Sequence, residues 1–277
     1  MVLAAEPFSA EGLWGFAQSL AQEGDYYRAV TEYKRLIYLH PEHPLAEKAA
    51  KEIGFSLLKA ERWDDAATYF EQLADKKPGA RLGEWAALQH ANLLFQRGKY
   101  ELALARYESF AEAYETSADR DEALYGIAWC HLMLGQYAEA KEAFLRVPEG
   151  SQRSKSAEEL AGASQEGMRL RRRSPTLAGI MAACVPGLGH LYAGRPRDAG
   201  ASFLLNGAFA AATASAFHAG ADVAGVVAGI FGLHWYSGNI FGALNFTHRF
   251  NKQQKDEFLN KLQKQYGAPA AEMKAGE

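Results

Sequence analysis

Histidines and glycines in the carboxyl-terminal third of the chain are the first residues to consider for chemistry. The histidines are His190, His218, His234 and His248. They show neither an HExxH motif nor the i,i+4 spacing with which a helix binds zinc. The glycines of Gly187-x-Gly189 lack phosphate-loop spacing, and no strand pattern precedes them. We therefore predict no catalytic residue, no metal and no cofactor. The histidines are interpreted as interhelical hydrogen-bond donors, with a metal or catalytic role as the less favoured alternative.

These residues lie in a stretch that is almost free of charge. The only charged side chains from Thr176 to His248 are Arg195, Arg197, Asp198 and Asp222. Charged residues are spread through the whole preceding sequence, so the change in composition marks a domain boundary near Pro175. The formal net charge of −3 argues against a general nucleic-acid-binding protein, which needs a basic surface.

The first half of the chain repeats with a period of 37 residues. The motif small/polar-x-aromatic-x-x-Ala recurs four times. Its alanines are Ala29, Ala66, Ala103 and Ala140. An aromatic column follows the same step, at Tyr33, Phe70, Tyr107 and Phe144. A small-residue column does so too, at Ala17, Gly54, Ala91 and Ala128.

This pattern predicts two antiparallel helices in each unit. The small residue lets one helix approach its neighbour closely, and the aromatic residue one turn after the alanine fills the space between them. A single helix pair cannot bury its apolar face, so the units must stack into a solenoid.

The repeat resembles the tetratricopeptide repeat in its internal spacing, over residues 9–148 and in four units. Pro41 and Pro78 close the first two units, but the closing proline is absent from the third and fourth. A second departure is that large residues stand seven positions after each central alanine, where the family has a small one. They are Leu36, Leu73, Phe110 and Val147.

The resemblance implies a concave groove, lined by the first helices, that binds a protein partner. Carried over by spacing, the groove positions are Trp14, Phe55, Leu58, Trp85, Leu88, Phe95, Tyr125, Trp129, Leu132 and Met133. Rigid aromatic anchors suit such a surface. The alternative is that several of these side chains fill the solenoid's own core or receive the protein's own linker.

A charged linker at 149–175, helical from about Ser156 to Leu170, leads to three apolar stretches. These are Leu177–Ala193, Ala199–Phe217 and Val223–Phe246. The last two are long enough to cross a bilayer. The first is broken at Pro186, which leaves a kinked span, a re-entrant segment or an interfacial one open.

Glycine steps in the third stretch predict close packing of membrane helices. The expected packing residues are Gly225, Gly229, Gly238, Asn239 and Gly242. We expect Asn206, His234, Asn239 and Asn245 to pair across helices, because an unpaired polar group is costly in lipid. The soluble alternative is a buried helical hairpin of a large globular core.

Two tracts in this half resemble the signature of the small two-transmembrane-helix domain family. They are Pro186–Arg195, with the sequence PGLGHLYAGR, and Trp235–Gly242, with the sequence WYSGNIFG. The resemblance covers residues 175–250 and implies a fold rather than an activity.

Basic residues predict the orientation. Arg171–Arg173, Arg195/Arg197 and Arg249/Lys252/Lys255 flank the last two stretches on one side, which the positive-inside rule places in the cytoplasm. Two spans then put the repeats in the cytoplasm and three put them outside. Met1–Glu6 resembles the end of a signal peptide, which favours the periplasmic arrangement slightly. Asn251–Tyr266 carries an apolar face that suits either an interfacial helix or a helix packed on the solenoid.

The sequence thus predicts an all-α protein with four regions: a repeat solenoid (1–148), a linker (149–175), a glycine-rich membrane domain (176–250) and an amphipathic tail (251–277). The favoured function is a non-enzymatic scaffold that holds a protein partner at the bacterial inner membrane, in envelope assembly, secretion or membrane-protein biogenesis. A lipid- or ion-handling component and a structural homo-oligomer are the alternatives.

Overall fold

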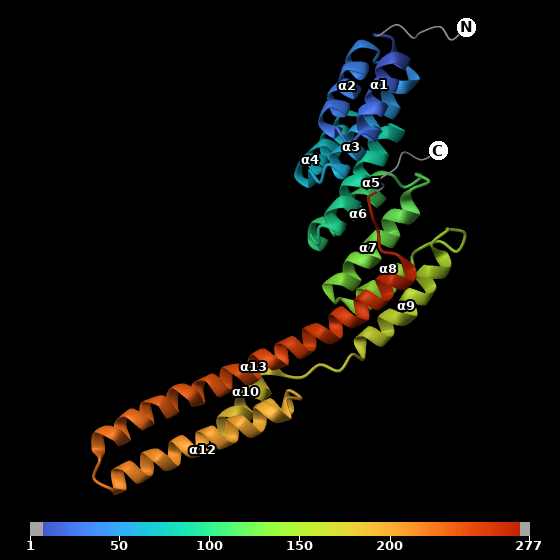
Figure 1. Cartoon of the computed structure of the whole chain (residues 1–277). Helices are drawn as coiled ribbons and strands as arrows, with labels where there is room; N and C mark the ends of the chain where they lie inside the picture. The colour runs from blue at the N-terminus through green and yellow to red at the C-terminus, as the bar shows by residue number, and fades with distance from the viewer. Residues whose placement is uncertain (1–7, 272–277) are drawn as a thin grey trace. The chain divides into compact units, whose positions relative to one another are not determined.

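The computed structural model describes residues 8–271, and all regular secondary structure in that range is α-helical (Figure 1). Met1–Glu6, with its likeness to a signal-peptide end, lies outside the described residues. The helices are α1 (Ala10–Gln22), α2 (Tyr26–Leu39), α3 (Pro44–Lys59), α4 (Trp63–Lys76), α5 (Arg81–Gln96), α6 (Tyr100–Ala113), α7 (Arg120–Leu134), α8 (Tyr137–Phe144), α9 (Ser154–Met168), α10 (Pro175–Cys184), α11 (Leu188–Tyr192), α12 (Pro196–His218) and α13 (Asp222–Tyr266).

The chain forms two compact units. The solenoid unit consists of the chain up to Met168 together with the segment from Gln263 onward. The apolar unit consists of Arg169–Leu262. The first unit therefore combines the two ends of the sequence, and the second is made from the residues between them.

Four consecutive helix pairs build the solenoid unit, as the repeat predicts: α1/α2, α3/α4, α5/α6 and α7/α8. Each helix packs on the next one along the chain. Helix α9 packs on α8 and ends the stack, with Ala157, Leu160 and Ala161 buried. The region predicted as a linker therefore contributes a ninth helix to the solenoid.

The three columns of the repeat form its core. All twelve residues of the alanine, aromatic and small-residue columns are buried. In the second unit the small residue is Gly54, and a Cβ there would collide with the Phe70 ring. The spacing of 37 residues is thus the spacing of one packing contact repeated four times.

A left-handed residue stands in the turn between the two helices of every unit. Gly24, Gly98 and Gly135 have φ of 84°, 71° and 81°. The second unit has Glu61 at the same position, with φ of 56°. It is the one non-glycine residue with positive φ among residues 8–271, and its Cβ makes this conformation unfavourable.

The first apolar stretch folds as two short helices rather than one. Helix α10 has 10 residues and α11 has 5, so neither approaches the roughly 20 residues that a span needs. The chain reverses at Gly187, where φ is 89°. Gly189 of α11 then lies directly against Ala178 and Ala182 of α10. Of the three alternatives for this stretch, a continuous kinked span is inconsistent with this fold.

Helix α13 is continuous over 45 residues, so Asn251–Tyr266 is the end of a longer helix and not a separate one. Helix α12 pairs with its first half. Among the described residues, α12 alone is long and apolar enough to cross a membrane, and its most apolar window is 0% buried. We expected two or three spans, and by these criteria one helix among the described residues qualifies.

Candidate functional site

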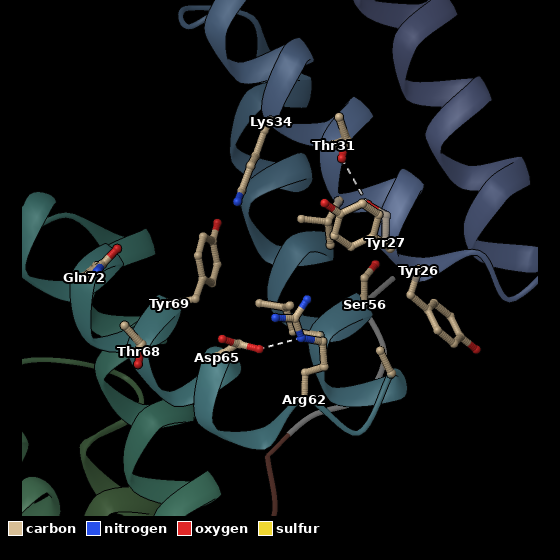
Figure 2. Close-up of a pocket in the computed structure, with 13 residues that line it drawn as sticks. Tyr26, Tyr27, Thr31, Lys34, Ser56, Arg62, Asp65, Thr68, Tyr69 and Gln72 are labelled. Carbon is tan, nitrogen blue, oxygen red and sulfur yellow. Dashed lines mark hydrogen bonds and ion pairs between the residues drawn. The ribbon is translucent and has the colours of Figure 1, made fainter.

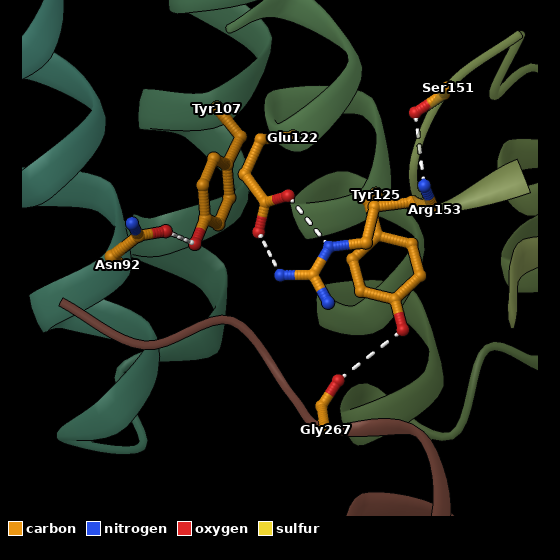
Figure 3. A network of polar contacts seen from close by, with 7 residues as sticks. All are labelled: Asn92, Tyr107, Glu122, Tyr125, Ser151, Arg153 and Gly267. Carbon is orange, nitrogen blue, oxygen red and sulfur yellow. Dashed lines mark hydrogen bonds and ion pairs between the residues drawn. The ribbon is translucent and has the colours of Figure 1, made fainter. Parts of the chain in front are cut away.

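The last described residues of the chain lie on the first helices of the solenoid. Helix α13 ends at Tyr266, and Gly267 leaves it in a left-handed conformation with φ of 70°. Residues 268–271 continue without helical structure. We call residues 263–271 the tail segment. Figure 3 shows its ribbon crossing α5 and α7, with the Gly267 carbonyl turned toward the side chain of Tyr125.

Three kinds of contact hold the tail segment. The Tyr125 hydroxyl donates a hydrogen bond to the Gly267 carbonyl oxygen, at 3.3 Å. The Gln263 side-chain amide donates to the Met133 sulfur at 3.7 Å. Ala271 is 4% exposed and belongs to an apolar cluster with Leu58 of α3 and Leu93 of α5. We call Leu58, Leu93, Tyr125 and Met133 the tail site.

The last three described residues of the tail segment alternate in burial. Pro269 and Ala271 are buried, whereas Ala270 between them is exposed. This period of two is that of an extended chain lying on a surface. The solenoid therefore holds a short extended peptide, by one main-chain hydrogen bond and two small apolar side chains.

An ion pair fixes the tyrosine that contacts the tail segment (Figure 3). Arg153, just before α9, donates two hydrogen bonds to the Glu122 carboxylate, at 2.8 and 2.9 Å. Its guanidinium lies 5.0 Å from the centre of the Tyr125 ring. The hydrogen bonds to Glu122 raise the pKa of Arg153, and burial raises the pKa of Tyr125. Tyr125 is therefore a neutral, oriented donor at physiological pH.

The ten residues predicted to line the groove divide into two groups. Tyr125 and Met133 form hydrogen bonds with the tail segment, Leu58 shares the buried cluster of Ala271, and Trp85 packs against that cluster. The remaining ones pack within the solenoid. Phe55 packs on Trp85, Phe95 packs on Trp129, and Trp14 packs on Tyr33. Phe55, Leu88, Phe95, Trp129 and Leu132 are buried.

Sequence reasoning did not find Gln263, Gly267, Pro269 and Ala271, nor the Glu122–Arg153 pair behind Tyr125. The alternation of small residues in the tail segment is too short to stand out from ordinary coil. The pairing of Arg153 with Glu122 joins the former linker to α7, and no local spacing indicates it.

A second hollow lies among α2, α3 and α4, with a volume of about 310 Å³ (Figure 2). Its wall includes Tyr27, Lys34 and Tyr69, and an ion pair joins Arg62 to Asp65 at 2.5 Å. The hollow contains charged and hydroxyl groups, but the charges of Arg62 and Asp65 already neutralise each other. Within residues 8–271, no group of three or more His, Cys, Asp or Glu side chains could hold a metal ion.

The glycine face of the apolar unit is used within the chain. A Cβ on Gly225 would lie 3.0 Å from the Phe217 ring, and one on Gly229 would lie 3.7 Å from Thr213. A further glycine that sequence reasoning did not select, Gly232, faces Phe209 at 3.1 Å. These contacts join α13 to α12.

The other expected packing residues differ from one another. Gly242 approaches His190 at 3.0 Å, whereas a Cβ on Gly238 would meet nothing within 4 Å. Asn239 is buried and bonds across helices: its amide donates to the Ala182 carbonyl and its oxygen accepts from the Gly187 N–H, both at 3.3 Å.

The remaining polar residues of this half do not follow the expectation of cross-helix pairing. Asn206 bonds within its own helix, to the Ser202 carbonyl at 2.7 Å, and His234 and Asn245 are exposed. An asparagine can satisfy its amide on the preceding turn of its own helix, so a polar residue on such a helix does not require a partner helix.

Comparison with known proteins identifies the repeats. The tetratricopeptide repeat family matches the chain twice, at residues 11–43 and at residues 88–154. A crystal structure of a tetratricopeptide repeat protein from Parabacteroides merdae is similar at 16% sequence identity, with a TM-score of 0.44. The similarity covers 91% of this chain and 98% of that one. The comparison with curated proteins finds no match. The matched segments show tetratricopeptide repeats in the solenoid unit, and such repeats indicate protein binding in general.

Proposed function

We propose that the protein is a membrane-tethered scaffold whose solenoid binds an extended segment of a partner protein at the tail site. The observation that carries the proposal is the tail segment itself. The first helices already hold an extended peptide, through a tyrosine hydroxyl and an apolar cluster. A surface that accepts one such segment has the shape and the donors to accept another.

The apolar unit supports the tether. Large apolar side chains point outward along α12 and the first half of α13, among them Phe203, Leu204, Ile230, Leu233 and Phe241. Each is at least 59% exposed, which is unfavourable in water and favourable among acyl chains. The glycine contacts between α12 and α13 supply close packing without large side chains.

The tail segment also favours one side of the membrane. Because residues 263–271 pack on the solenoid, both must lie on the same side, so the chain between them crosses an even number of times. If α12 crosses, the first half of α13 must cross back. We therefore propose two crossings of the bacterial inner membrane. With the basic flanks on the inner side, we propose that the solenoid lies in the cytoplasm, in preference to the periplasmic arrangement.

Partner binding is tested with Trp85→Ala, which trims the apolar cluster of the tail site. The matched control is Tyr38→Ala, because Tyr38 is 84% exposed on α2. Proteins that co-purify from membranes with the intact chain should fall at least tenfold with Trp85→Ala and stay unchanged with Tyr38→Ala. Equal recovery from both variants, with equal helical content by circular dichroism, contradicts the proposed binding surface.

The tether and its orientation are tested separately. The chain should stay in the membrane fraction through a carbonate wash and leave it only in detergent. For the orientation, exposed Glu101 is replaced by Cys in a background that lacks the exposed Cys184. An impermeant thiol reagent should label this cysteine only after spheroplasts are permeabilised. Labelling of intact spheroplasts overturns the cytoplasmic placement.

Lipid binding is a second candidate, favoured by an apolar groove of about 740 Å³ between α12 and α13. Phe203, Ala210, Leu233 and Tyr236 are part of its lining, and Asn206 is a polar group beside them. Co-purified lipid that is lost on Ala210→Trp, with partner capture retained, would support this alternative.

A further inference from the structure

The tail segment occupies its site with few and small buried side chains. Its two buried residues are Pro269 and Ala271, and its one main-chain hydrogen bond uses the Gly267 carbonyl. Ala271 shares a buried cluster with Leu58, Ala66, Phe70 and Leu93, which are all nearly inaccessible to solvent. A methyl group fits among them, whereas a larger side chain would have to displace residues of the solenoid core.

We propose that the tail segment is a built-in ligand of the tail site, and that a partner must displace it with a segment of the same chemistry. That segment is extended, with small apolar residues or proline at alternate positions and few charges. The inference rests on the proposed function, because it names the class of partner that the same surface binds. Here the chain's own tail segment keeps the surface closed until such a partner competes.

The contacts of the tail site recognise the main chain of the bound segment and the size of its side chains. Tyr125 recognises a carbonyl group, which every residue has, and the Arg153–Glu122 pair holds its ring in place. The alternation at 269–271 then selects small residues at every second position. Proline at one of them lowers the conformational entropy that the free segment loses on binding.

The covalent link gives the tail segment an advantage over any free competitor. The link runs through the apolar unit, residues 169–262, and we take for it the effective concentration of a flexible intramolecular link, on the order of 1 mM. If the same segment binds in trans with a Kd of about 10 µM, the site is open about 1% of the time, and an external segment binds about 100-fold more weakly than to the vacant site. The tail segment therefore sets a threshold for partner binding.

The experiment uses a fluorescent synthetic peptide of residues 263–277 and measures its anisotropy with the detergent-solubilised chain. The intact chain is compared with a chain that ends at Tyr266 and with two full-length variants. Ala271→Arg places a charge in the apolar cluster and should release the tail segment. Ala270→Arg is the matched control, because Ala270 is exposed beside it.

The shortened chain and Ala271→Arg should bind the peptide at least tenfold more tightly than the intact chain and Ala270→Arg. A scrambled peptide of the same composition should not bind. Equal affinity for all four proteins, or no binding by the shortened chain when circular dichroism shows it folded, overturns the inference. Tighter binding by Ala270→Arg than by Ala271→Arg overturns it as well.

The result is distinguishable from a failure of the proposed function. If the peptide binds the shortened chain but Trp85→Ala leaves partner capture unchanged, the tail segment is a cis ligand and the partner binds elsewhere. If the peptide does not bind but Trp85→Ala abolishes partner capture, the tail site binds partners and the inference that the tail segment is a built-in ligand is wrong.

Discussion

The solenoid unit and the apolar unit share one packing contact, in which an aromatic ring lies against a glycine. In the solenoid, Phe70 packs on Gly54. In the apolar unit, Phe217 packs on Gly225, and Phe209 on Gly232. The two units differ in their remaining large side chains. The solenoid buries its aromatic column completely, whereas α12 has no buried residue and exposes Phe203, Leu204 and Phe217.

The same glycine contact therefore occurs in a helix pair whose aromatic column is buried and in one whose large apolar side chains are exposed. A small residue opposite an aromatic ring brings helices together in water and in lipid alike. The outer face distinguishes them, because water excludes apolar side chains and acyl chains do not. The predictions below test this comparison, beginning with the largest expected effect.

Truncation of Phe70 in the solenoid and of Phe203 in the apolar unit should give the largest difference in stability between the two units. Phe70→Ala leaves a cavity between α3 and α4 and should destabilise the solenoid by about 3–5 kcal/mol. Phe203→Ala removes a ring that is 61% exposed and should cost less than about 0.5 kcal/mol. Thermal unfolding followed by circular dichroism in one detergent measures both. Similar losses for the two variants would show that α12 is buried against protein rather than surrounded by detergent.

Overpacking of the α12/α13 contact should have the next largest effect. Gly232→Leu forces a side chain against Phe209 and should destabilise the helix pair by about 1–3 kcal/mol. Gly238→Leu is the matched control, because a Cβ there meets nothing within 4 Å. Protease resistance of the apolar unit in detergent reports the change. Equal resistance of the two leucine variants would contradict the pairing of α12 with α13.

Relief of the strained turn in the second repeat should stabilise the solenoid modestly. Glu61→Gly removes the cost of positive φ and should add about 0.5–1 kcal/mol, as the glycines of the other three units indicate. The reverse change, Gly98→Ala, should destabilise the third unit by a similar amount. Thermal midpoints of the two variants should move in opposite directions, and a drop for Glu61→Gly would mean that the Glu61 side chain is required there.

A buried histidine should make the solenoid slightly sensitive to acid. Burial lowers the pKa of His90 below its ordinary value of 6.5, and nearby Arg106 adds to this effect. The folded state therefore favours the neutral ring, so stability is fully present above pH 6.5 and is lost as the pH falls through the lowered pKa. His90→Gln should weaken the fall in the thermal midpoint between pH 7.5 and pH 5.5, and His234→Gln should leave it unchanged. An undiminished fall in His90→Gln would place the acid sensitivity elsewhere.

The repeat architecture was predictable because the sequence of each unit contains the residues that pack its two helices together. The three columns at a step of 37 identify which helix faces meet, and the left-handed turn follows from Gly24, Gly98 and Gly135. Helix α9 was predicted within two residues of its observed bounds, but its membership of the solenoid was not. Its packing on α8 brings together residues such as Gly167 and Tyr137, which no periodicity relates.

The site was predicted less completely, for a physical reason. Residue types and spacing place Leu58, Tyr125 and Met133 on one surface, but they do not say what covers it. The covering segment comes from the far end of the sequence, and its contacts are a main-chain carbonyl and a methyl group. Such contacts require no particular residue type, so the sequence does not indicate them. The same limit applies to Gly238 and Gly242, which share a motif but differ in what they face.

The order of the segments along the chain has a consequence for biogenesis. A ribosome completes the helices of the solenoid before it begins the apolar unit, residues 169–262, and it makes the tail segment after that unit. At synthesis rates of about 5–20 residues per second, the newly folded repeats stand uncapped for an interval on the order of 5–20 s. A nascent solenoid can therefore accept another segment at the tail site before the apolar unit is finished, and the tail segment closes that site only after it has been synthesised.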